Sequence, residues 1–464
     1  MKNLILLLIS AFIVNSCGGG GSRSQTPKSN ASMEKSYAVK LITVDPGHFH
    51  AALVQKIMYD QVSPEVHVYA PEGPDYLQHL ERIKLYNNRP GNPTEWKEVV
   101  YTGPDFFEKM LSDKPGNVVV LSGNNRKKAE YITKSINAGL NVLADKPMII
   151  EPDDFPLLEA AFKASEEKGV LLYDIMTERD EITTILQKML SQNSEIFGSL
   201  TTGSKDDPAV TKISVHHFSK IVSGKALQRP AWYFDVQQQG EGIVDVTTHL
   251  VDLVQWECFP GQILNPSDIE MISAKRWPTQ ISKEEFKLVT GFDDFPLYLE
   301  KDIREGKLNV YANGEMIYKI RNVYSKVSVE WKFEAPPGGG DTHYSVMHGT
   351  KCDLMIRQGT EEKFVPTLYV ENIKGLTFDK FGLKLKEVLK AFPYDSLQIE
   401  AAGNNSFKVI IPPKYSVSHE EHFGQVMTRF LQYLKDGKLP DWEVPGMITK
   451  YYTTTSALKM ARGK

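Results

Sequence analysis

Three residues in this chain have the types and spacing needed to move a proton and stabilise a charge. Asp245 and His249 are four residues apart, so on a helix their side chains would share one face. A carboxylate beside an imidazole can fix the orientation of the ring and tune its basicity toward neutrality, where a general base works best. Lys146 follows a short apolar stretch that is typical of a strand. A lysine just past the end of a strand can polarise a hydroxyl and stabilise developing alkoxide charge. Each alone would suit a helix cap, a core histidine or a surface lysine, but together they predict a catalytic group.

The first strand-to-helix turn is a candidate cofactor site. A strand is predicted at residues 38–44 and a helix at 50–59, and a dinucleotide pyrophosphate binds backbone N–H groups at such a turn. A complete glycine fingerprint would place glycines at 45, 47 and 50, whereas this chain has Asp45, Gly47 and His50. His48 and His50 either cap the helix or face a ligand. We predict contacts to a cofactor from Asp45, Gly47, His48 and Phe49, although a turn that binds no nucleotide is an equally good interpretation of this motif alone.

An acidic residue follows the second predicted strand, at residues 66–70. An acid roughly 20 residues after the glycines can hydrogen-bond the ribose hydroxyls of the cofactor. Glu72 is the acidic residue available at this strand end. Because a carboxylate repels a 2′-phosphate, Glu72 favours NAD over NADP.

Polar residues also follow the next two predicted strands, at residues 117–121 and 141–143. The first runs into Ser122, Asn124 and Asn125, and the second into Asp145 and Lys146. The carboxyl ends of parallel strands border the crevice in which open α/β sheets bind ligands. We therefore predict that these five residues line the cofactor.

Several residues later in the chain are candidates for contact with substrate. Trp232 and Tyr233 could supply an apolar face for a sugar ring, or serve as core aromatics. His216 and His217 lie in a predicted strand, so only one of them can face a cleft, and we assign His217 to the substrate. His343 follows a glycine-rich loop that could close over substrate. Asp341 and His343 could also be metal ligands, but no second ligand pair has a diagnostic spacing, so no metal is expected.

The order of predicted elements indicates two kinds of architecture. Strands and helices alternate from residue 38 to about 178, which is typical of a Rossmann-type, doubly wound parallel sheet; residues 71–98 look like an inserted loop with a helical piece at 76–85. Strands then follow one another, which indicates an α+β domain with a mostly antiparallel open sheet. Ser418 and Glu421 form a capping box for a late helix that Gly437 ends.

Composition narrows the class of protein. The 464 residues suggest two or three domains, at roughly 150 residues each. The formal net charge of −4 shows no basic footprint for nucleic acid. Three cysteines are too few for a disulfide framework, and Cys258 and Cys352 could either pair or stay buried.

The N-terminus is typical of an exported protein. Residues 4–14 form an apolar run that is shorter than the roughly 20 residues a membrane helix needs and suits a signal peptide. The run ends at Cys17 in a sequence that resembles a bacterial lipobox, which implies that Cys17 is lipidated; the alternative is an ordinary secretory signal. We predict a signal peptide at 1–16, a lipidated tether at 17–37, a dinucleotide-binding domain at 38–178 and a substrate and oligomerisation domain at 179–464. Membrane attachment would be through the lipid alone.

The Asp145-Lys146-Pro147 motif and the stretch from Gly240 to Asp252 together resemble the Gfo/Idh/MocA oxidoreductase family. Asp145-Lys146-Pro147 resembles the family's Glu-Lys-Pro motif, and Asp245 and His249 resemble its catalytic Asp and His. The resemblance covers residues 38 to about 260, and residues 331–350 resemble part of a C-terminal domain of a secreted branch. The resemblance implies a nicotinamide cofactor. A homo-oligomer formed through the second sheet is an open alternative to a monomer.

The family resemblance and the leader-like N-terminal sequence together imply a lipid-anchored enzyme that faces the periplasm. Its expected activity is NAD-dependent oxidation of a secondary hydroxyl of a sugar or glycoside, with C3 as the candidate position and NAD retained between turnovers. One alternative is an NAD-dependent glycosidase that oxidises its substrate transiently and eliminates the leaving group. A second alternative is a sugar-binding lipoprotein without catalysis.

Overall fold

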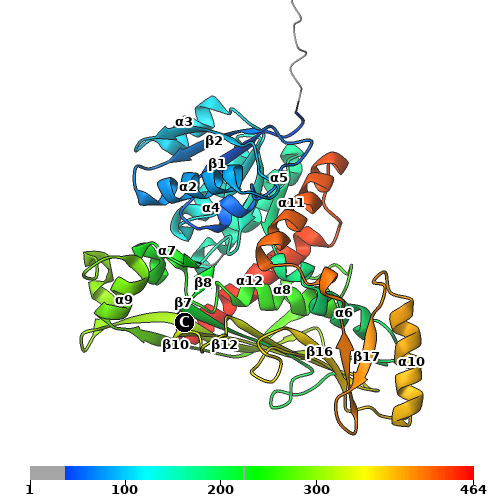
Figure 1. The fold of residues 1–464 in the computed structure, drawn as a ribbon. Coiled ribbons are helices and arrows are strands. Elements are labelled where there is room, and N and C mark those ends of the chain that lie inside the picture. The colour runs from blue at the N-terminus through cyan, green and yellow to red at the C-terminus, as the bar shows by residue number, and fades with distance from the viewer. Residues whose placement is uncertain (1–36, 223–224, 464) are drawn as a thin grey trace, which may run out of the picture. The chain divides into compact units, whose positions relative to one another are not determined.

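Six parallel strands form the first sheet of the protein, described by a computed structural model that covers residues 37–222 and 225–463. The predicted signal peptide, Cys17 and nearly all of the predicted tether lie outside these residues. The strand order is β3-β2-β1-β4-β5-β6, so the direction of winding reverses between β1 and β4 (Figure 1). The strands are β1 (Leu41–Val44), β2 (Glu65–Ala70), β3 (Lys97–Thr102), β4 (Val118–Leu121), β5 (Asn141–Asp145) and β6 (Leu172–Ile175).

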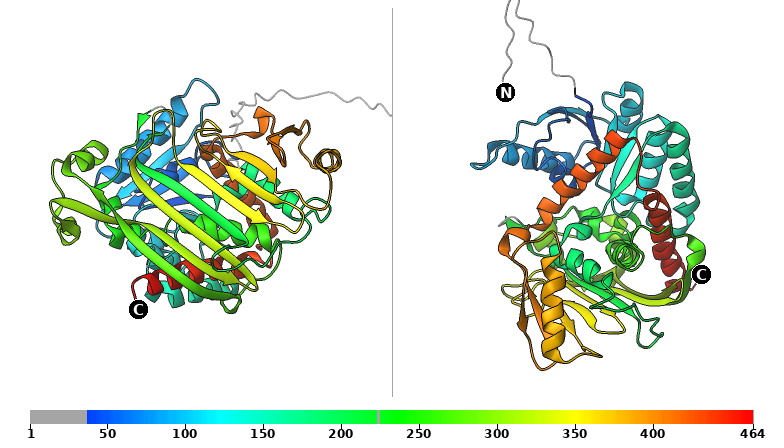
Figure 2. Two further views of the ribbon diagram at one scale, coloured as in Figure 1. Left: turned by 90° about the horizontal axis from the view of Figure 1, so that it is seen from below. Right: turned by 90° about the vertical axis from the view of Figure 1, so that its right-hand side faces the viewer.

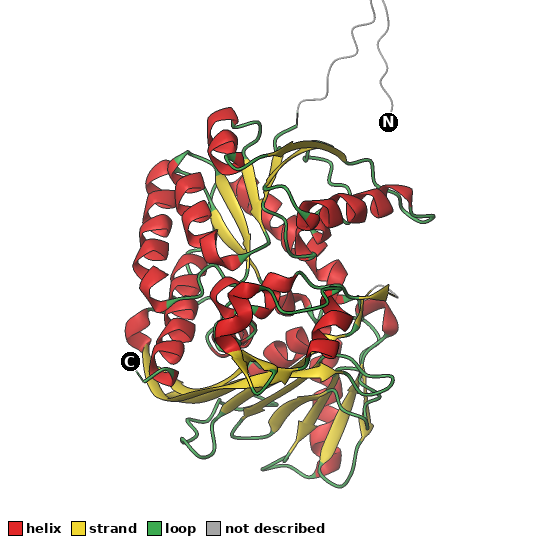
Figure 3. Ribbon diagram, turned by 90° about the vertical axis from the view of Figure 1, so that its left-hand side faces the viewer, coloured by secondary structure: helices red, strands yellow, loops and turns green. Residues whose placement is uncertain are grey.

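Helices flank this sheet, as expected for a doubly wound fold (Figure 3). All four residues of β1 and of β4 are buried, which explains their continuous runs of apolar and β-branched side chains. The fold predicted for this half of the chain is confirmed. The helices are α1 (His50–Leu53), α2 (Pro74–Asn88), α3 (Phe106–Asp113), α4 (Lys128–Asn137) and α5 (Phe155–Lys168).

Two predicted boundaries near the first turn are wrong. The helix expected at 50–59 ends at Leu53, because the N–H groups of Gln55 and Lys56 bond three residues back, to Ala52 and Leu53. The stretch at 71–98 is mainly the 15-residue helix α2, and β3 begins at Lys97. β3 lies at the edge of the sheet and none of its residues is buried, so it lacks the apolar run that reveals the other strands.

The second sheet has ten strands within the described residues and is mixed (Figure 2, left). Among its paired strands only β7 and β13 run parallel, so the prediction of a mostly antiparallel sheet is confirmed. The longest of these strands, β12, has 14 residues. The strands are β7 (Val210–Ser219), β10 (Ile269–Ile281), β11 (Ile303–Arg304), β12 (Lys307–Ile320), β13 (Val323–Glu334), β14 (Thr342–His348), β15 (Asp353–Arg357), β16 (Thr367–Glu371), β17 (Gln398–Ala401) and β18 (Ser406–Ile410).

Further helices pack around this sheet and the segments that join it to the first. A short hairpin of β8 (Ile221–Val222) and β9 (Lys225–Ala226) follows β7. The helices are α6 (Ile182–Ser191), α7 (Val236–Gln239), α8 (Thr247–Cys258), α9 (Lys283–Thr290) and α10 (Phe378–Lys390).

The last two helices, α11 (His419–Asp436) and α12 (Glu443–Ala461), tie the two sheets together. The capping box of Ser418 and Glu421 forms as predicted, and the apolar face of α11 shares a hydrophobic cluster with the first sheet. On α12, the fully buried Lys450 lies 2.8 Å from Asp174 Oδ2, at β6, and 2.8 Å from Asp252 Oδ1, on α8. These contacts hold the carboxyl edge of the first sheet in a set position relative to α8.

Two further expectations concern membranes and thiols. Within the described part of the chain, no helix is both long and apolar enough to cross a membrane. Cys258 and Cys352 are free thiols, so of the two alternatives the unpaired one is observed.

Candidate active site

A cavity of about 1140 Å³ opens where the carboxyl ends of the first sheet face the second sheet. Its walls come from the loops after β1, β4, β5 and β6, from β7 and β14, and from the start of α8 and of α11. The lining is rich in imidazoles: His48, His50, His216, His249, His343, His419 and His422. This is the position at which doubly wound sheets bind ligands.

Lys146 and Asp245 meet at this cavity. Lys146 Nζ donates to Asp245 Oδ1 at 2.6 Å, and Gln239 Nε2 donates to Asp245 Oδ2 at 3.1 Å. The expectation that Asp245 orients His249 is therefore wrong. Helix α8 begins only at Thr247, so Asp245 lies in the preceding turn and the two side chains do not share a helical face.

His249 lines the same cavity, and one of its ring nitrogens makes no hydrogen bond in the described structure. Its Nδ1 is buried and has no hydrogen-bond partner among residues 37–222 and 225–463. Burial, together with the charge of Lys146, holds the pKa of His249 well below its usual value. The imidazole is therefore neutral near pH 7 and able to accept a proton.

The first turn differs from a dinucleotide fingerprint in what fills its glycine positions. His50 occupies the place of the third glycine, and its Nδ1 lies 2.9 Å from Asp145 Oδ2. Ser122 Oγ donates to the same carboxylate oxygen at 2.9 Å. Burial alone would raise the pKa of Asp145, but His50 and Lys128 hold it well below the usual value. Asp145 is thus an anion within a hydrogen-bonded cluster.

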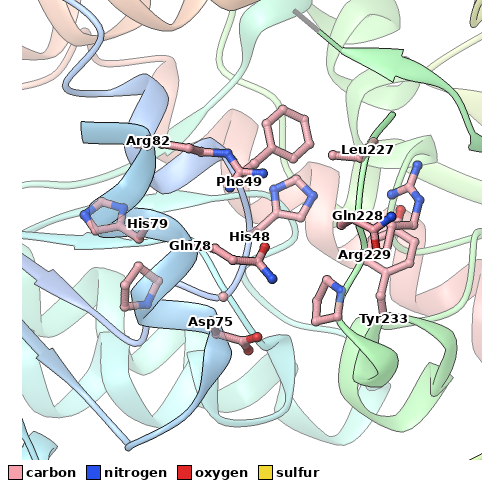
Figure 4. Close-up of a pocket in the computed structure, with 14 residues that line it drawn as sticks. His48, Phe49, Asp75, Gln78, His79, Arg82, Leu227, Gln228, Arg229 and Tyr233 are labelled. Atoms are coloured by element: carbon pink, nitrogen blue, oxygen red, sulfur yellow. The ribbon is translucent and has the colours of Figure 1, made fainter. Parts of the chain in front are cut away.

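The remaining glycine of the turn is covered by protein. A Cβ on Gly47 would lie 3.0 Å from the Trp232 ring and 3.0 Å from Asp75 Oδ2. Trp232 Nε1 donates to Asp75 Oδ2 at 2.7 Å, which fixes the indole there. Asp45, at the first glycine position, has a φ of 48°, and burial and the nearby Asp75 raise its pKa to about 6. Figure 4 shows Asp75 beside the first turn and Tyr233 across from it.

The other predicted cofactor residues divide into two groups. Asn125 lines the cavity, and its Oδ1 is buried without a partner in the described structure. Asn124 instead caps a short 3-10 helix by accepting from the Arg126 N–H at 3.0 Å. Glu72 is exposed beyond β2, just before α2.

Of the predicted substrate residues, Tyr233 and His343 line the cavity, and Trp232 does not. His217 is also absent from the lining; its neighbour on β7, His216, takes the cavity-facing place. The choice of His217 is wrong because alternation along a strand allows one of the two histidines to face the cavity, and the sequence does not reveal which.

The structure reveals a proton-relay arrangement on β7 that sequence reasoning missed. Ser214 Oγ lies 2.6 Å from His216 Nε2, and His216 Nδ1 lies 3.1 Å from Asp341 Oδ2. Lys220 Nζ donates to Asp341 Oδ2 at 2.5 Å. Burial lowers the pKa of His216, so this imidazole is also neutral. Ser214 and His216 are two residues apart on a strand, a spacing that places them on one face.

Glu178 is a second residue that sequence reasoning missed. It follows β6 and lines the cavity, with His419 Nδ1 at 3.5 Å from its Oε1. Burial of the carboxyl group, and then the like charge of Glu181, raise the pKa of Glu178 to about 7. Its position just after a parallel strand was the available signal, as for Lys146.

A Rossmann-type sheet joined to a large mixed sheet, with an acid–base cavity between them, defines the class of protein as an oxidoreductase of the two-domain kind. Residues 186–462, more than half of the chain, match the family described as "Putative oxidoreductase C terminal domain", and the chain belongs to this family.

Solved structures with the same fold span nearly the whole chain. A "putative oxidoreductase from Parabacteroides merdae ATCC 43184" is 56% identical, with a TM-score of 0.89 over 92% of this chain and 98% of its own. Levoglucosan dehydrogenase, solved with NADH and levoglucosan, is 12% identical, with a TM-score of 0.57 over 92% of this chain and 97% of its own; that likeness concerns the fold alone. No curated protein matches the sequence.

Proposed function

We propose that this protein oxidises a secondary hydroxyl of a sugar or glycoside with a nicotinamide cofactor. The observation that carries the proposal is one cavity lined by both members of the Lys146–Asp245 ion pair and by the neutral imidazole of His249. It is supported by the fold shared with levoglucosan dehydrogenase, which was solved with NADH and a sugar.

The cavity fits the nicotinamide end of such a cofactor. Asn125 and Gln239 line it, and within the part of the chain described their side-chain oxygens are buried acceptors without partners. An amide-bearing ring would supply the donors these acceptors lack. At the pyrophosphate end, Trp232 must leave Gly47 before phosphate can approach that backbone.

When bound, the nicotinamide ring accepts a hydride from the substrate carbon. The residues of this chain manage the proton and the charge. His249 accepts the hydroxyl proton, because its ring is neutral and lines the cavity. Lys146 Nζ, held by Asp245, donates to the substrate oxygen and stabilises its developing negative charge.

We further propose NAD rather than NADP, because Glu72 follows β2 and would repel a 2′-phosphate. The leader-like residues 1–16 and Cys17 support an exported lipoprotein facing the periplasm. Outside the cytoplasm there is no ready nicotinamide pool, so NAD would stay bound. Each oxidation would leave NADH in the site, and a second carbonyl compound would have to accept its hydride before the next turnover. Oxidation at C3 of a glycoside is the specific form of this proposal.

A glycosidase that passes through a transient ketone is the second candidate. It needs another acid–base group for the elimination, and two such groups lie in the cavity. Glu178 has a pKa of about 7, and His216 is oriented by Asp341. These groups support the candidate without selecting it over simple oxidation.

The test combines cofactor content with product identity. Freshly purified protein is denatured, and released nicotinamide is identified by mass; it is then incubated with methyl glycosides. Stoichiometric NAD with keto-sugar formed up to the amount of bound NAD, and beyond it when a ketone is supplied as hydride acceptor, supports the dehydrogenase. Free sugar without keto product supports the glycosidase. Absence of nicotinamide, together with no NAD affinity by calorimetry, would instead indicate a sugar-binding lipoprotein.

A further inference from the structure

Three metal-ligating side chains converge at the bottom of the cavity. His48 and His50 come from the first turn and Asp145 from the end of β5, and their nearest ligand atoms all lie within 4.8 Å of one another. We infer that His48, His50 and Asp145 form a binding site for a divalent transition-metal ion of the Zn²⁺ class. This inference goes beyond the proposed function and does not depend on it.

The distances match the geometry that such an ion requires. Metal–ligand bonds of roughly 2.0–2.2 Å in a tetrahedron place ligand atoms about 3.3 Å apart. His50 Nδ1 lies 2.9 Å, and His48 Nδ1 3.8 Å, from Asp145 Oδ2. The two separations bracket the required value, so small rotations of side chains would complete the site.

The chain also supplies the outer contacts that orient metal ligands. Ser122 Oγ donates to Asp145 Oδ2 at 2.9 Å, and Lys128 Nζ donates to the Asp145 backbone oxygen at 2.9 Å. The His50 ring packs against Phe49 and Phe423, with ring centroids at 4.4 Å and 4.6 Å. These contacts restrict the carboxylate and one imidazole before any ion arrives.

An ion here would keep a coordination position open to the cavity. All three side chains are part of the cavity lining, next to Lys146 and Glu178. Three protein ligands with one open position are typical of a catalytic rather than a structural zinc site. Lys146, the cation that follows Asp145 in the chain, is already paired with Asp245 at 2.6 Å, which reduces its repulsion of a second positive charge. The open position would take water or a sugar hydroxyl.

The sequence alone led us to expect no metal, because no second ligand pair at a diagnostic spacing accompanies Asp341 and His343. The ligands proposed here come from the turn after β1 and from the end of β5, two strands that lie on either side of β4 in the folded sheet. His50 replaces the third glycine of the fingerprint, so the substitution that weakens the dinucleotide motif builds the cluster.

The test is metal binding by the chelator-treated full-length protein. Titration with Co²⁺ should give the visible absorption bands of a low-coordinate nitrogen–oxygen site at one ion per chain. Competition with a chromophoric chelator then gives the Zn²⁺ affinity. His50→Ala and Asp145→Asn should each weaken Zn²⁺ binding at least about tenfold. His422→Ala is the matched control, because His422 lines the same cavity outside the cluster and should leave the affinity unchanged.

His48→Gln keeps the inference testable where another variant does not fold, since His48 makes only long contacts, at 3.4 Å and 3.8 Å. The inference is overturned if the wild-type protein takes up no stoichiometric Co²⁺ or Zn²⁺, or if His48→Gln and His50→Ala bind as the wild type does. Nicotinamide content is measured on the same samples. If the wild-type protein binds metal but carries no nicotinamide, the proposed function alone is contradicted. If it carries nicotinamide but binds no metal, this inference alone is contradicted.

Discussion

Lys146 and Asp245, 99 residues apart in the chain, form an ion pair of 2.6 Å with side chains only 11% and 6% accessible to water. The pair joins the end of β5 to the turn before α8, and thus the two segments that carry the predicted catalytic residues. It leaves His249 free of a carboxylate partner, which makes the lysine, rather than the histidine, the residue that Asp245 positions.

We expect Asp245→Ala to destabilise the protein by about 3 kcal/mol, because it leaves a buried ammonium unpaired. Asp245→Asn should cost less, since the amide oxygen still accepts a hydrogen bond from Lys146. Urea unfolding measures both. Asp395→Ala is the control: it removes the exposed partner of Lys414 and should change stability by less than about 1 kcal/mol. Equal losses in Asp245→Ala and Asp395→Ala would mean that the buried pair has no special role.

We expect His249→Gln to lower kcat by about 10²- to 10⁴-fold, the usual contribution of a positioned general base. KM should change little, because the neutral ring is assigned to proton removal rather than to binding. Steady-state kinetics on methyl glycosides measures both constants, with retained nicotinamide confirming an intact fold. His422→Gln lies in the same cavity and should keep kcat near the wild-type value. A small effect of His249→Gln would remove His249 from the mechanism.

We expect Glu178 to make both activity and stability depend on pH near neutrality. Its pKa is raised to about 7 from a usual value of 4.5, so the folded state binds more protons than the unfolded state between these values. Its contribution to stability is therefore present below about pH 4.5 and is lost as pH rises through about 7. The charged groups that act on it are Glu181, Lys146, Asp180 and Asp341, with His419 in contact.

Glu178→Gln removes this titration. Urea unfolding from pH 4 to 8 should show that the variant gains stability relative to the wild type as pH rises. In a plot of kcat against pH, the change in kcat near pH 7 that the wild type shows should disappear. Glu181→Gln should move this change to lower pH without abolishing it, because the like charge of Glu181 raises the pKa of Glu178. Parallel pH profiles for wild type and Glu178→Gln would show that Glu178 does not titrate in this range.

We expect Asp75→Ala to strengthen dinucleotide binding. The hydrogen bond from Trp232 to Asp75 holds the indole over Gly47, and its loss should favour the open position by about 1 kcal/mol, or roughly fivefold in affinity. The substitution also removes a negative charge close to Gly47, the backbone that the phosphates of the cofactor would approach. Calorimetry with NAD on cofactor-stripped protein measures this. Asp105→Ala removes an exposed acid elsewhere on the first domain and should leave the affinity unchanged. Weaker binding by Asp75→Ala would show that the contact supports the site rather than closing it.

Strand ends were the part of the site that sequence reasoning placed well. Asp145 and Lys146 line the cavity and Ser122 donates to Asp145 from beneath it, because carboxyl ends of neighbouring parallel strands share one edge, and β4 and β5 were recognisable as apolar runs. The capping box at Ser418 formed as predicted, because it depends on residues only three apart. The exposed edge strand β3 carried no comparable pattern.

The chain sequence by itself determined the class of both sheets and the edge of the first sheet that borders the cavity, since these follow from local periodicity and from the topology of parallel strands. Only the tertiary structure decided which side chains pair. Asp245 meets Lys146 rather than His249, His216 rather than His217 lines the cavity, and Trp232 covers Gly47. The physical reason is that such contacts depend on how segments distant in sequence pack, to within about an ångström, and local patterns carry no information at that scale.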